Sequence, residues 1–223
     1  MHKTVVIAHR GFHRDFPENT IEAFRAARDL GADGIEFDVH ETADGGFVIY
    51  HDADIDGHSI DGLSLTEIAA LRVSGDYRIP TLEDALKAVG RGMVLLVELK
   101  KVWSLERFLA ILRRYIDPAW TVLVSFDAGL IAKLAALAPG FSLAVIREPG
   151  GAGNSAAVRA SGFTQLAAGA VTVDQVKEAH SRGDLVFVWD GGEEDDLRRA
   201  LRCGIDVLMT DRPDVVIREV RKL

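Results

Sequence analysis

The sequence has few of the residues that mark secreted, membrane or nucleic-acid-binding proteins. Cys203 is the single cysteine among 223 residues, so no disulfide can form within the chain. The 26 basic residues are outnumbered by 34 acidic ones, and a net charge of −8 argues against a nucleic-acid surface, which needs clustered Lys and Arg. No apolar run reaches the roughly 18 residues of a membrane span or signal anchor. We therefore expect a cytoplasmic protein that binds no nucleic acid and does not insert stably into a membrane, with no oligomeric state indicated.

What the sequence does contain is a regular alternation of apolar strand patterns and helical patterns. Hydrophobic residues make up 48% of the chain, enough for a substantial core. The helical patterns lie near 104–116, 128–138, 153–161, 172–182, 194–203 and 213–222. The predicted strands are Val5–Ala8, Ile35–Val39, Val94–Glu98, Thr121–Ser125, Ser142–Ile146, Thr164–Ala167, Leu185–Trp189 and Asp206–Met209.

Eight strands alternating with helices in a chain of this length predict a (β/α)8 TIM barrel, with residues 1–223 as one domain. A doubly wound sheet is the alternative, but the Gly-x-Gly-x-x-Gly turn typical of it does not follow the first strand. The first helix is predicted to begin with Asn19 as N-cap and Glu22 at the third helical position, and to end at Gly31.

The alternation is interrupted after the second strand. Asp44-Gly45, followed by the apolar run Phe47–His51, predicts a β-hairpin. If these two residues form the centre of the turn, residue 51 lies opposite residue 38, which places His51 beside Asp38. The polar, turn-rich stretch at about 52–81 is predicted to be a short insertion with a brief helix near 65–71.

Three carboxylates lie in or at the ends of predicted strands. Glu36 and Asp38 are two residues apart on one strand, so their side chains point to the same face. Two buried acids repel each other unless a cation joins them, and oxygen ligands suit Mg²⁺ or Ca²⁺. Glu98 ends another apolar run and is the candidate third ligand; a salt bridge with Lys100 is the structural alternative. We predict one divalent cation, Mg²⁺ or Ca²⁺, at Glu36, Asp38 and Glu98, with Lys100 holding phosphate.

Two histidines and an arginine accompany the acids. His9 directly follows the first strand, and imidazole titrates near neutrality, so His9 and His51 are candidates for acid–base catalysis. The guanidinium group of Arg10 can donate hydrogen bonds to two phosphoryl oxygens at once. The alternative is a salt bridge between Arg10 and Glu18. Trp189 ends a strand, where it either contacts substrate or belongs to the core.

Six motifs follow one another along the chain: His9-Arg10-Gly11, Pro17-Glu18-Asn19-Thr20, Glu36-x-Asp38, His51-Asp52, Glu98-x-Lys100 and Thr210-Asp211-Arg212-Pro213. This ordered set resembles the glycerophosphodiester phosphodiesterase family, within the phosphatidylinositol-specific phospholipase C-like phosphodiesterase superfamily. The resemblance implies metal-dependent hydrolysis of a small glycerophosphodiester to sn-glycerol 3-phosphate and an alcohol. It also supports a substrate-facing Trp189, although Asp190 stands where the family generally has Thr. The family's Arg-Thr-Thr-like run after His51-Asp52 is missing, so the alcohol group is not predicted.

Other functions remain open at this point. A lysophospholipase D-type phosphodiesterase of the same superfamily would need an apolar entrance, which the polar 52–62 loop does not offer. A non-catalytic phosphate-binding barrel would not need two histidines and three carboxylates together. Attack by the substrate's own glycerol 2-hydroxyl and direct attack by water both fit. The remaining histidines, including His13, are predicted to be surface or structural residues, and Asp211 is predicted to cap the final helix.

Overall fold

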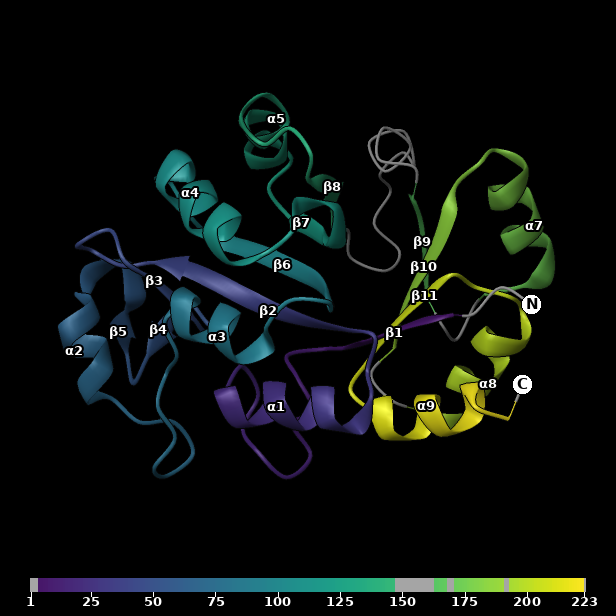
Figure 1. Cartoon of the computed structure of the whole chain (residues 1–223), viewed down its shortest axis with the longest axis horizontal. Coiled ribbons are helices and arrows are strands. Elements are labelled where there is room, and N and C mark those ends of the chain that lie inside the picture. The colour runs from purple at the N-terminus through teal and green to yellow at the C-terminus, as the bar shows by residue number, and fades with distance from the viewer. Residues whose placement is uncertain (1–3, 147–162, 168–170, 191–192, 223) are drawn as a thin grey trace.

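The computed structural model describes residues 4–146, 163–167, 171–190 and 193–222, and it shows a curved sheet with helices on its outer side (Figure 1). Eight parallel strands follow the order β8-β7-β6-β2-β1-β11-β10-β9, which is the order expected of the predicted (β/α)8 barrel. No ladder joins β8 to β9 in the described part of the chain. The strands are β1 (Val5–Ala8), β2 (Gly34–Glu41), β6 (Val94–Lys101), β7 (Thr121–Ser125), β8 (Ser142–Val145), β9 (Phe163–Ala167), β10 (Leu185–Asp190) and β11 (Val207–Thr210).

The helices between these strands agree with the predicted alternation at most positions. They are α1 (Ile21–Leu30), α3 (Leu82–Val89), α4 (Leu105–Tyr115), α5 (Ala128–Leu137), α7 (Val173–Ser181), α8 (Glu194–Arg202) and α9 (Pro213–Val220), with a short 3-10 turn, η2 (Pro118–Trp120), before β7. The predicted helix near 153–161 lies outside the described residues. Helix α3 was not predicted, although Thr81 caps it by accepting a hydrogen bond from Asp84 N at 3.1 Å.

The main core fills the layer between the sheet and the helices. Phe37 on β2 packs against Phe24 of α1 with ring centroids 5.7 Å apart, and both are fully buried. All eight residues of β2 are buried, so this strand has no solvent-facing side. Because alternate side chains point to opposite faces, Phe37 enters the helix layer while Glu36 and Asp38 face the inside of the curved sheet.

The start of α1 differs from the prediction by one residue. Thr20 is the N-cap, and its side-chain oxygen accepts a hydrogen bond from Ala23 N at 3.3 Å. Asn19 is buried and has φ +58°, in the left-handed region that Asn tolerates better than most residues. The prediction of Asn19 as N-cap was therefore wrong, which leaves its amide for another partner. The helix ends as predicted, with Gly31 in the left-handed conformation.

Strand β3 (Phe47–Ile49) forms the predicted hairpin with β2, but the register is shifted by one residue. Val39 lies opposite Ile49, and Tyr50 N donates to the carbonyl oxygen of Asp38 at 3.1 Å. Residue 50, rather than His51, is thus opposite Asp38, and the predicted register was wrong.

The shift comes from the loop that joins the two strands. The loop spans residues 42–46 and is longer than the predicted two-residue turn, with Thr42 Oγ1 accepting a hydrogen bond from Gly46 N at 2.8 Å. A Cβ at Gly46 would overlap the side chain of Leu65, so the close approach of Leu65 requires glycine at this position.

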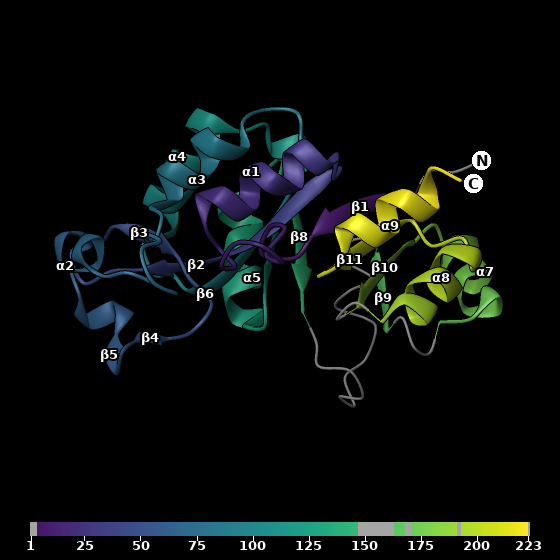
Figure 2. The same cartoon turned by 90° about the horizontal axis from the view of Figure 1, so that it is seen from below.

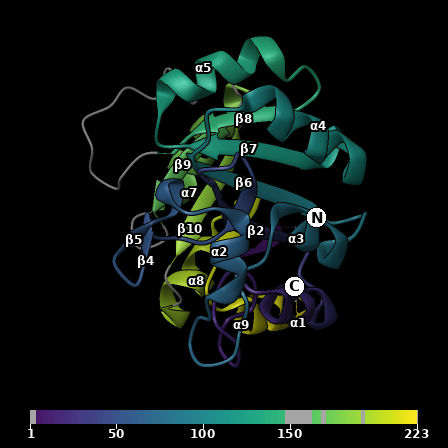
Figure 3. The ribbon, with the colours of Figure 1, turned by 90° about the vertical axis from the view of Figure 1, so that its left-hand side faces the viewer.

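The insertion after the hairpin is a packed segment and not an open loop. It contains β4 (Asp54–Ile55), β5 (His58–Ser59), η1 (Ile60–Gly62) and α2 (Leu65–Ala70). Ile55, Ile60 and Ile68 of these elements pack with Val48 and Ile79 in a small apolar cluster. Figure 2 shows α2, β4 and β5 at the end of the molecule remote from α7, and in Figure 3 they face the viewer. Across the described ranges, no helix combines the length and the apolar character needed to cross a membrane.

Candidate active site

The predicted site residues gather at the carboxyl ends of the central strands. A cavity of about 560 Å³ is lined by His9, Arg10, Glu36, His51, Glu98, Lys100 and Trp189, among other residues. Asp38 lies directly behind this lining, opposite Glu98 in the β2–β6 ladder. The carboxyl end of parallel strands is the position that catalytic groups occupy in (β/α)8 barrels.

The three carboxylates form one buried cluster. Glu36, Asp38 and Glu98 each offer an oxygen within 4.8 Å of the others, and their exposed fractions are 2%, 0% and 8%. Burial, together with repulsion from Asp38 and Glu98, raises the pKa of Glu36 well above its usual value. Burial also raises the pKa of Glu98. The cluster is therefore short of positive charge.

Lys100 lies beside this cluster, at a bulge in β6. The β2–β6 register passes from Val39 opposite Leu99 to His40 opposite Lys101, which leaves Lys100 as the extra residue. Its Nζ lies 2.6 Å from Glu98 Oε1 and 3.1 Å from Asp38 Oδ1. Burial lowers the pKa of Lys100, but the two carboxylates outweigh it and the net pKa is raised. The salt bridge considered as the structural alternative is thus present.

The donor set fits a hard divalent cation. Asp38 Oδ1 and Glu98 Oε1 are buried and receive no hydrogen bond of good geometry, so their compensation comes from charge alone. Lys100 and Arg10 supply two positive charges to three acids. An all-oxygen set without thiolate or imidazole is typical of Mg²⁺ and Ca²⁺ sites.

Arg10 holds the carboxylates from the other side. Its backbone N–H donates to Glu36 Oε2 at 3.0 Å, and its Nε lies 3.3 Å from Asp38 Oδ2. The same side chain donates to Glu18 Oε1 at 2.9 Å, so the alternative pair with Glu18 is also present. Arg10 has φ +53°, a conformation that costs a non-glycine residue about 1–2 kcal/mol. The strained turn is what aims both its N–H and its guanidinium inward.

Asn19 also belongs to the site, although the sequence did not predict it as a site residue. Its Nδ2 donates to Asp38 Oδ2 at 2.8 Å, and both residues are buried. The amide fixes the orientation of the carboxylate, as outer partners of metal ligands commonly do. Asn19 stands in one of the six motifs, and that was the only signal for this role.

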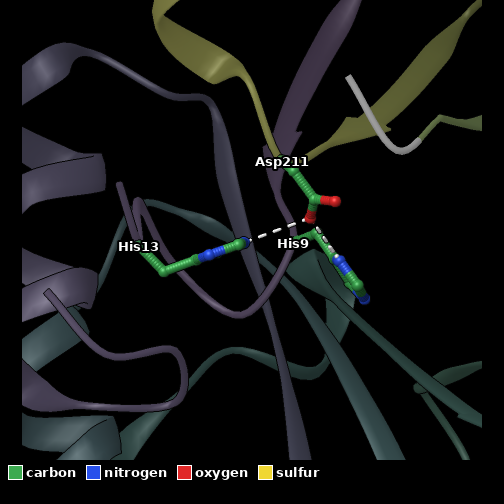
Figure 4. Close-up of side chains that lie close together, drawn as sticks. All are labelled: His9, His13 and Asp211. Atoms are coloured by element: carbon green, nitrogen blue, oxygen red, sulfur yellow. Dashed lines mark hydrogen bonds and ion pairs between the residues drawn. The ribbon is translucent and has the colours of Figure 1, made fainter. Parts of the chain in front are cut away.

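His9 is held by a carboxylate from the opposite end of the chain. Its Nδ1 lies 2.7 Å from Asp211 Oδ1 (Figure 4). Its Nε2 lies 3.9 Å from Glu36 Oε2. A carboxylate only accepts, so Nδ1 carries the hydrogen of this bond and Nε2 is turned toward the carboxylate cluster. His13 Nε2 lies 3.1 Å from the same Asp211 oxygen.

These contacts correct one prediction. Asp211 does not cap the final helix, because the N-cap position of α9 belongs to Arg212, without a side-chain hydrogen bond. His13 is only partly exposed and bonds to a residue of the site. Burial raises the pKa of Asp211, but the hydrogen bonds from His13 and His9 outweigh it and hold that pKa well below its ordinary value.

His51 and Trp189 complete the lining of the cavity. The His51 side chain is 36% exposed, and its Nδ1 lies 2.8 Å from Asp52 Oδ1. His51 reaches the cavity from the segment that follows β3, and not through the predicted register. Trp189, 38% exposed, packs edge-to-face on the His9 ring with centroids 5.6 Å apart. The two histidines therefore reach one cavity from the segments that follow two different strands, β1 and β3.

The model of the glycerophosphoryl diester phosphodiesterase family matches residues 9–215 of the chain. The chain belongs to this family. A glycerophosphodiester phosphodiesterase of Caldanaerobacter subterraneus subsp. tengcongensis is 29% identical, and the match covers 99% of each chain. The crystal structure of a glycerophosphodiester phosphodiesterase from Parabacteroides distasonis superimposes with a TM-score of 0.82 at 28% identity, covering 99% of this chain and 98% of the other.

A second solved structure, of an Oleispira antarctica phosphodiesterase in complex with the product sn-glycerol-3-phosphate, has a TM-score of 0.84 at 22% identity, with 99% of this chain and 98% of the other covered. These likenesses confirm the (β/α)8 fold. As a glycerophosphoryl diester phosphodiesterase family member, the chain is a phosphoric diester hydrolase. The stretch matched to the family runs from His9 past Asp211, so it includes every residue of the site described above.

Proposed function

We propose that this enzyme hydrolyses glycerophosphodiesters to sn-glycerol 3-phosphate and a free alcohol, using one divalent cation, Mg²⁺ or Ca²⁺, and histidine acid–base catalysis. The observation that carries the proposal is the joint position of three buried carboxylates and two histidines at one cavity, which Glu36, Glu98, His9 and His51 line and Asp38 lies behind. The Oleispira antarctica relative, whose structure contains sn-glycerol-3-phosphate, supports the choice of product. We also propose that residues 1–223 form one domain.

Glu36, Asp38 and Glu98 would hold the cation. When bound, a divalent cation supplies positive charge to phosphoryl oxygens and favours the ionised form of a hydroxyl beside it. Asn19 would keep Asp38 in position for this task, because its amide donates to Oδ2 while Oδ1 has no hydrogen-bond partner and only the charge of Lys100 beside it.

Arg10 and Lys100 would receive the phosphoryl group of the substrate. Both cations lie against the carboxylates and both are only 18% exposed, so a phosphate in the cavity would meet them in a poorly hydrated setting. Charge-assisted hydrogen bonds of this kind are stronger than neutral ones. They would also stabilise the extra negative charge that develops as the diester is attacked.

His9 and His51 would move protons to and from the entering and leaving oxygens. Asp211 fixes the His9 ring with Nε2 directed inward, and Trp189 packs against the same ring. His51 lines the cavity from the segment after β3, so the two rings can serve different oxygens of one substrate.

The test measures glycerol 3-phosphate released from a panel of glycerophosphodiesters, with and without EDTA, followed by addition of Mg²⁺ or Ca²⁺. We expect turnover to stop on chelation and to return with either cation. Full activity after exhaustive chelation would refute the metal role. Faster turnover of lysophosphatidylcholine than of glycerophosphocholine would favour the lysophospholipase D-type alternative.

Folded His9→Ala and His51→Ala variants should each lose about 10²–10⁴-fold in kcat, the range typical of a missing general acid or base. A variant that keeps wild-type kcat would remove that histidine from the mechanism.

A further inference from the structure

A second cluster of metal-ligating side chains lies beside the catalytic cavity. His9 Nδ1 and His13 Nε2 both point to one oxygen, Asp211 Oδ1, at 2.7 and 3.1 Å (Figure 4). The three ligand atoms lie within 4.8 Å of one another. His13 stands outside the six motifs of the sequence, and the reaction proposed above does not use it.

Two imidazole nitrogens that converge on one point can both bind a transition-metal ion placed there. A Zn²⁺ ion binds histidine nitrogen at about 2.0–2.1 Å, which is shorter than either hydrogen bond. An ion between the rings would therefore take the present place of Asp211 Oδ1, with the carboxylate withdrawing to become the third ligand.

The surroundings of the cluster allow this exchange. The side chains of His9, His13 and Asp211 are 11%, 25% and 27% exposed, so an ion can enter from solvent and keep water as a fourth ligand. His13 and Asp211 lie on the segments that follow β1 and β11, outside the ladders of the sheet. Small movements of both are thus compatible with the fold.

The ligand chemistry separates this cluster from the three-carboxylate site. Two imidazoles and one carboxylate suit Zn²⁺ and other borderline transition metals, whereas Mg²⁺ and Ca²⁺ prefer oxygen alone. The two sites would therefore take different cations from the same solution.

We propose that His9, His13 and Asp211 form a binding site for Zn²⁺ or a similar transition-metal cation, and that its occupation inhibits the enzyme. A metal on His9 Nδ1 would separate the ring from Asp211 and force the remaining ring hydrogen onto Nε2, the atom turned toward the cavity. The binding site stands on its own geometry. Its inhibitory effect rests on the proposed catalytic role of His9.

The direct test is calorimetric titration of the whole enzyme with Zn²⁺ in saturating Mg²⁺, using wild type, His13→Gln and His58→Gln. His58 lies on the exposed β5, away from the cluster, and serves as the matched control. We expect wild type and H58Q to bind with equal affinity. H13Q should bind more than about 100-fold more weakly, because loss of even an outer partner of a metal ligand costs about 10–100-fold. Equal affinity in all three proteins would overturn the site.

The second test measures inhibition of hydrolysis by Zn²⁺. H13Q should keep the uninhibited rate of wild type and lose sensitivity to Zn²⁺, while H58Q should stay sensitive. If H13Q folds poorly, His13→Asn replaces it. Inhibition that disappears as Mg²⁺ is raised would mean that Zn²⁺ acts at the carboxylates, which would overturn the inhibitory role. If calorimetry shows that Zn²⁺ binding is lost in H13Q but wild type hydrolyses no diester, the metal site is upheld and the function proposed above is rejected.

Discussion

Asn19 and Asp38 are joined by two hydrogen bonds in opposite directions. The Asn19 amide nitrogen donates to Asp38 Oδ2 at 2.8 Å, and the Asp38 backbone N–H donates to Asn19 Oδ1 at 3.4 Å. The loop before α1 is thereby fixed to the strand that carries two candidate metal ligands. The pair links the position of a carboxylate to the conformation of a loop.

Removal of the Asn19 amide should weaken metal binding without destroying the site. We expect Asn19→Ala and Asn19→Gly each to lower the affinity for Mg²⁺ by about 10–100-fold. Glycine serves as the control for strain, since φ +58° costs alanine about 1–2 kcal/mol and costs glycine little. The measurement is the Mg²⁺ dependence of kcat together with the melting temperature. Wild-type Mg²⁺ dependence in both variants would contradict the role of Asn19.

Asp211 should act through His9. We expect Asp211→Asn to reduce kcat by about 10²–10⁴-fold with little change in KM, because the amide no longer selects the required tautomer. In a His9→Ala background the same substitution should cost almost nothing further. This cycle distinguishes positioning from a general structural effect, which would add to the loss from His9→Ala.

The buried Glu36 should make the metal-free enzyme less stable at neutral pH than at mildly acidic pH. Burial and repulsion raise the pKa of Glu36 in the folded state, so its contribution to stability is complete below the unfolded value of about 4.3 and is lost as the pH rises through the raised pKa. Glu36→Gln does not titrate. In EDTA, the melting temperature of the variant relative to wild type should therefore increase from about pH 4 to about pH 8. A difference that stays constant would contradict the raised pKa.

The close contact between Gly46 and Leu65 should be sensitive to one methyl group. Gly46→Ala would place a Cβ inside the Leu65 side chain, and overpacking of this kind costs about 1–3 kcal/mol. Gly62→Ala is the matched control, because nothing lies within 4 Å of its added Cβ and the residue is exposed. Urea unfolding measures both. Equal stability of the two variants would show that the loop moves away from Leu65 and accommodates the added methyl group.

The sequence predicted the features that depend on local periodicity. The eight strands appear within three residues of their predicted ends, and the spacing of Glu36 and Asp38 correctly placed both side chains on one face. The hairpin register was wrong because the loop spans residues 42–46, with Gly46 N donating to Thr42 Oγ1, and a two-residue turn pattern does not reveal this.

The missed contacts are long-range ones. Asn19 and Asp211 were each assigned a local capping role, since the sequence shows only their neighbours along the chain. In the fold, their side chains bond to Asp38 and His9, which lie 19 and 202 positions away.

The pairing of β1 with β11 also sets the order in which the enzyme can be completed during synthesis. His9 and Asp211 are 202 positions apart, so at about 5–20 residues per second the carboxylate is made about 10–40 s after the histidine. In the finished sheet β1 lies between β2 and β11, so until β11 is made only β2 can pair with it. The three carboxylates of the cation site all lie within the first hundred residues, whereas the partner that orients His9 follows the last strand.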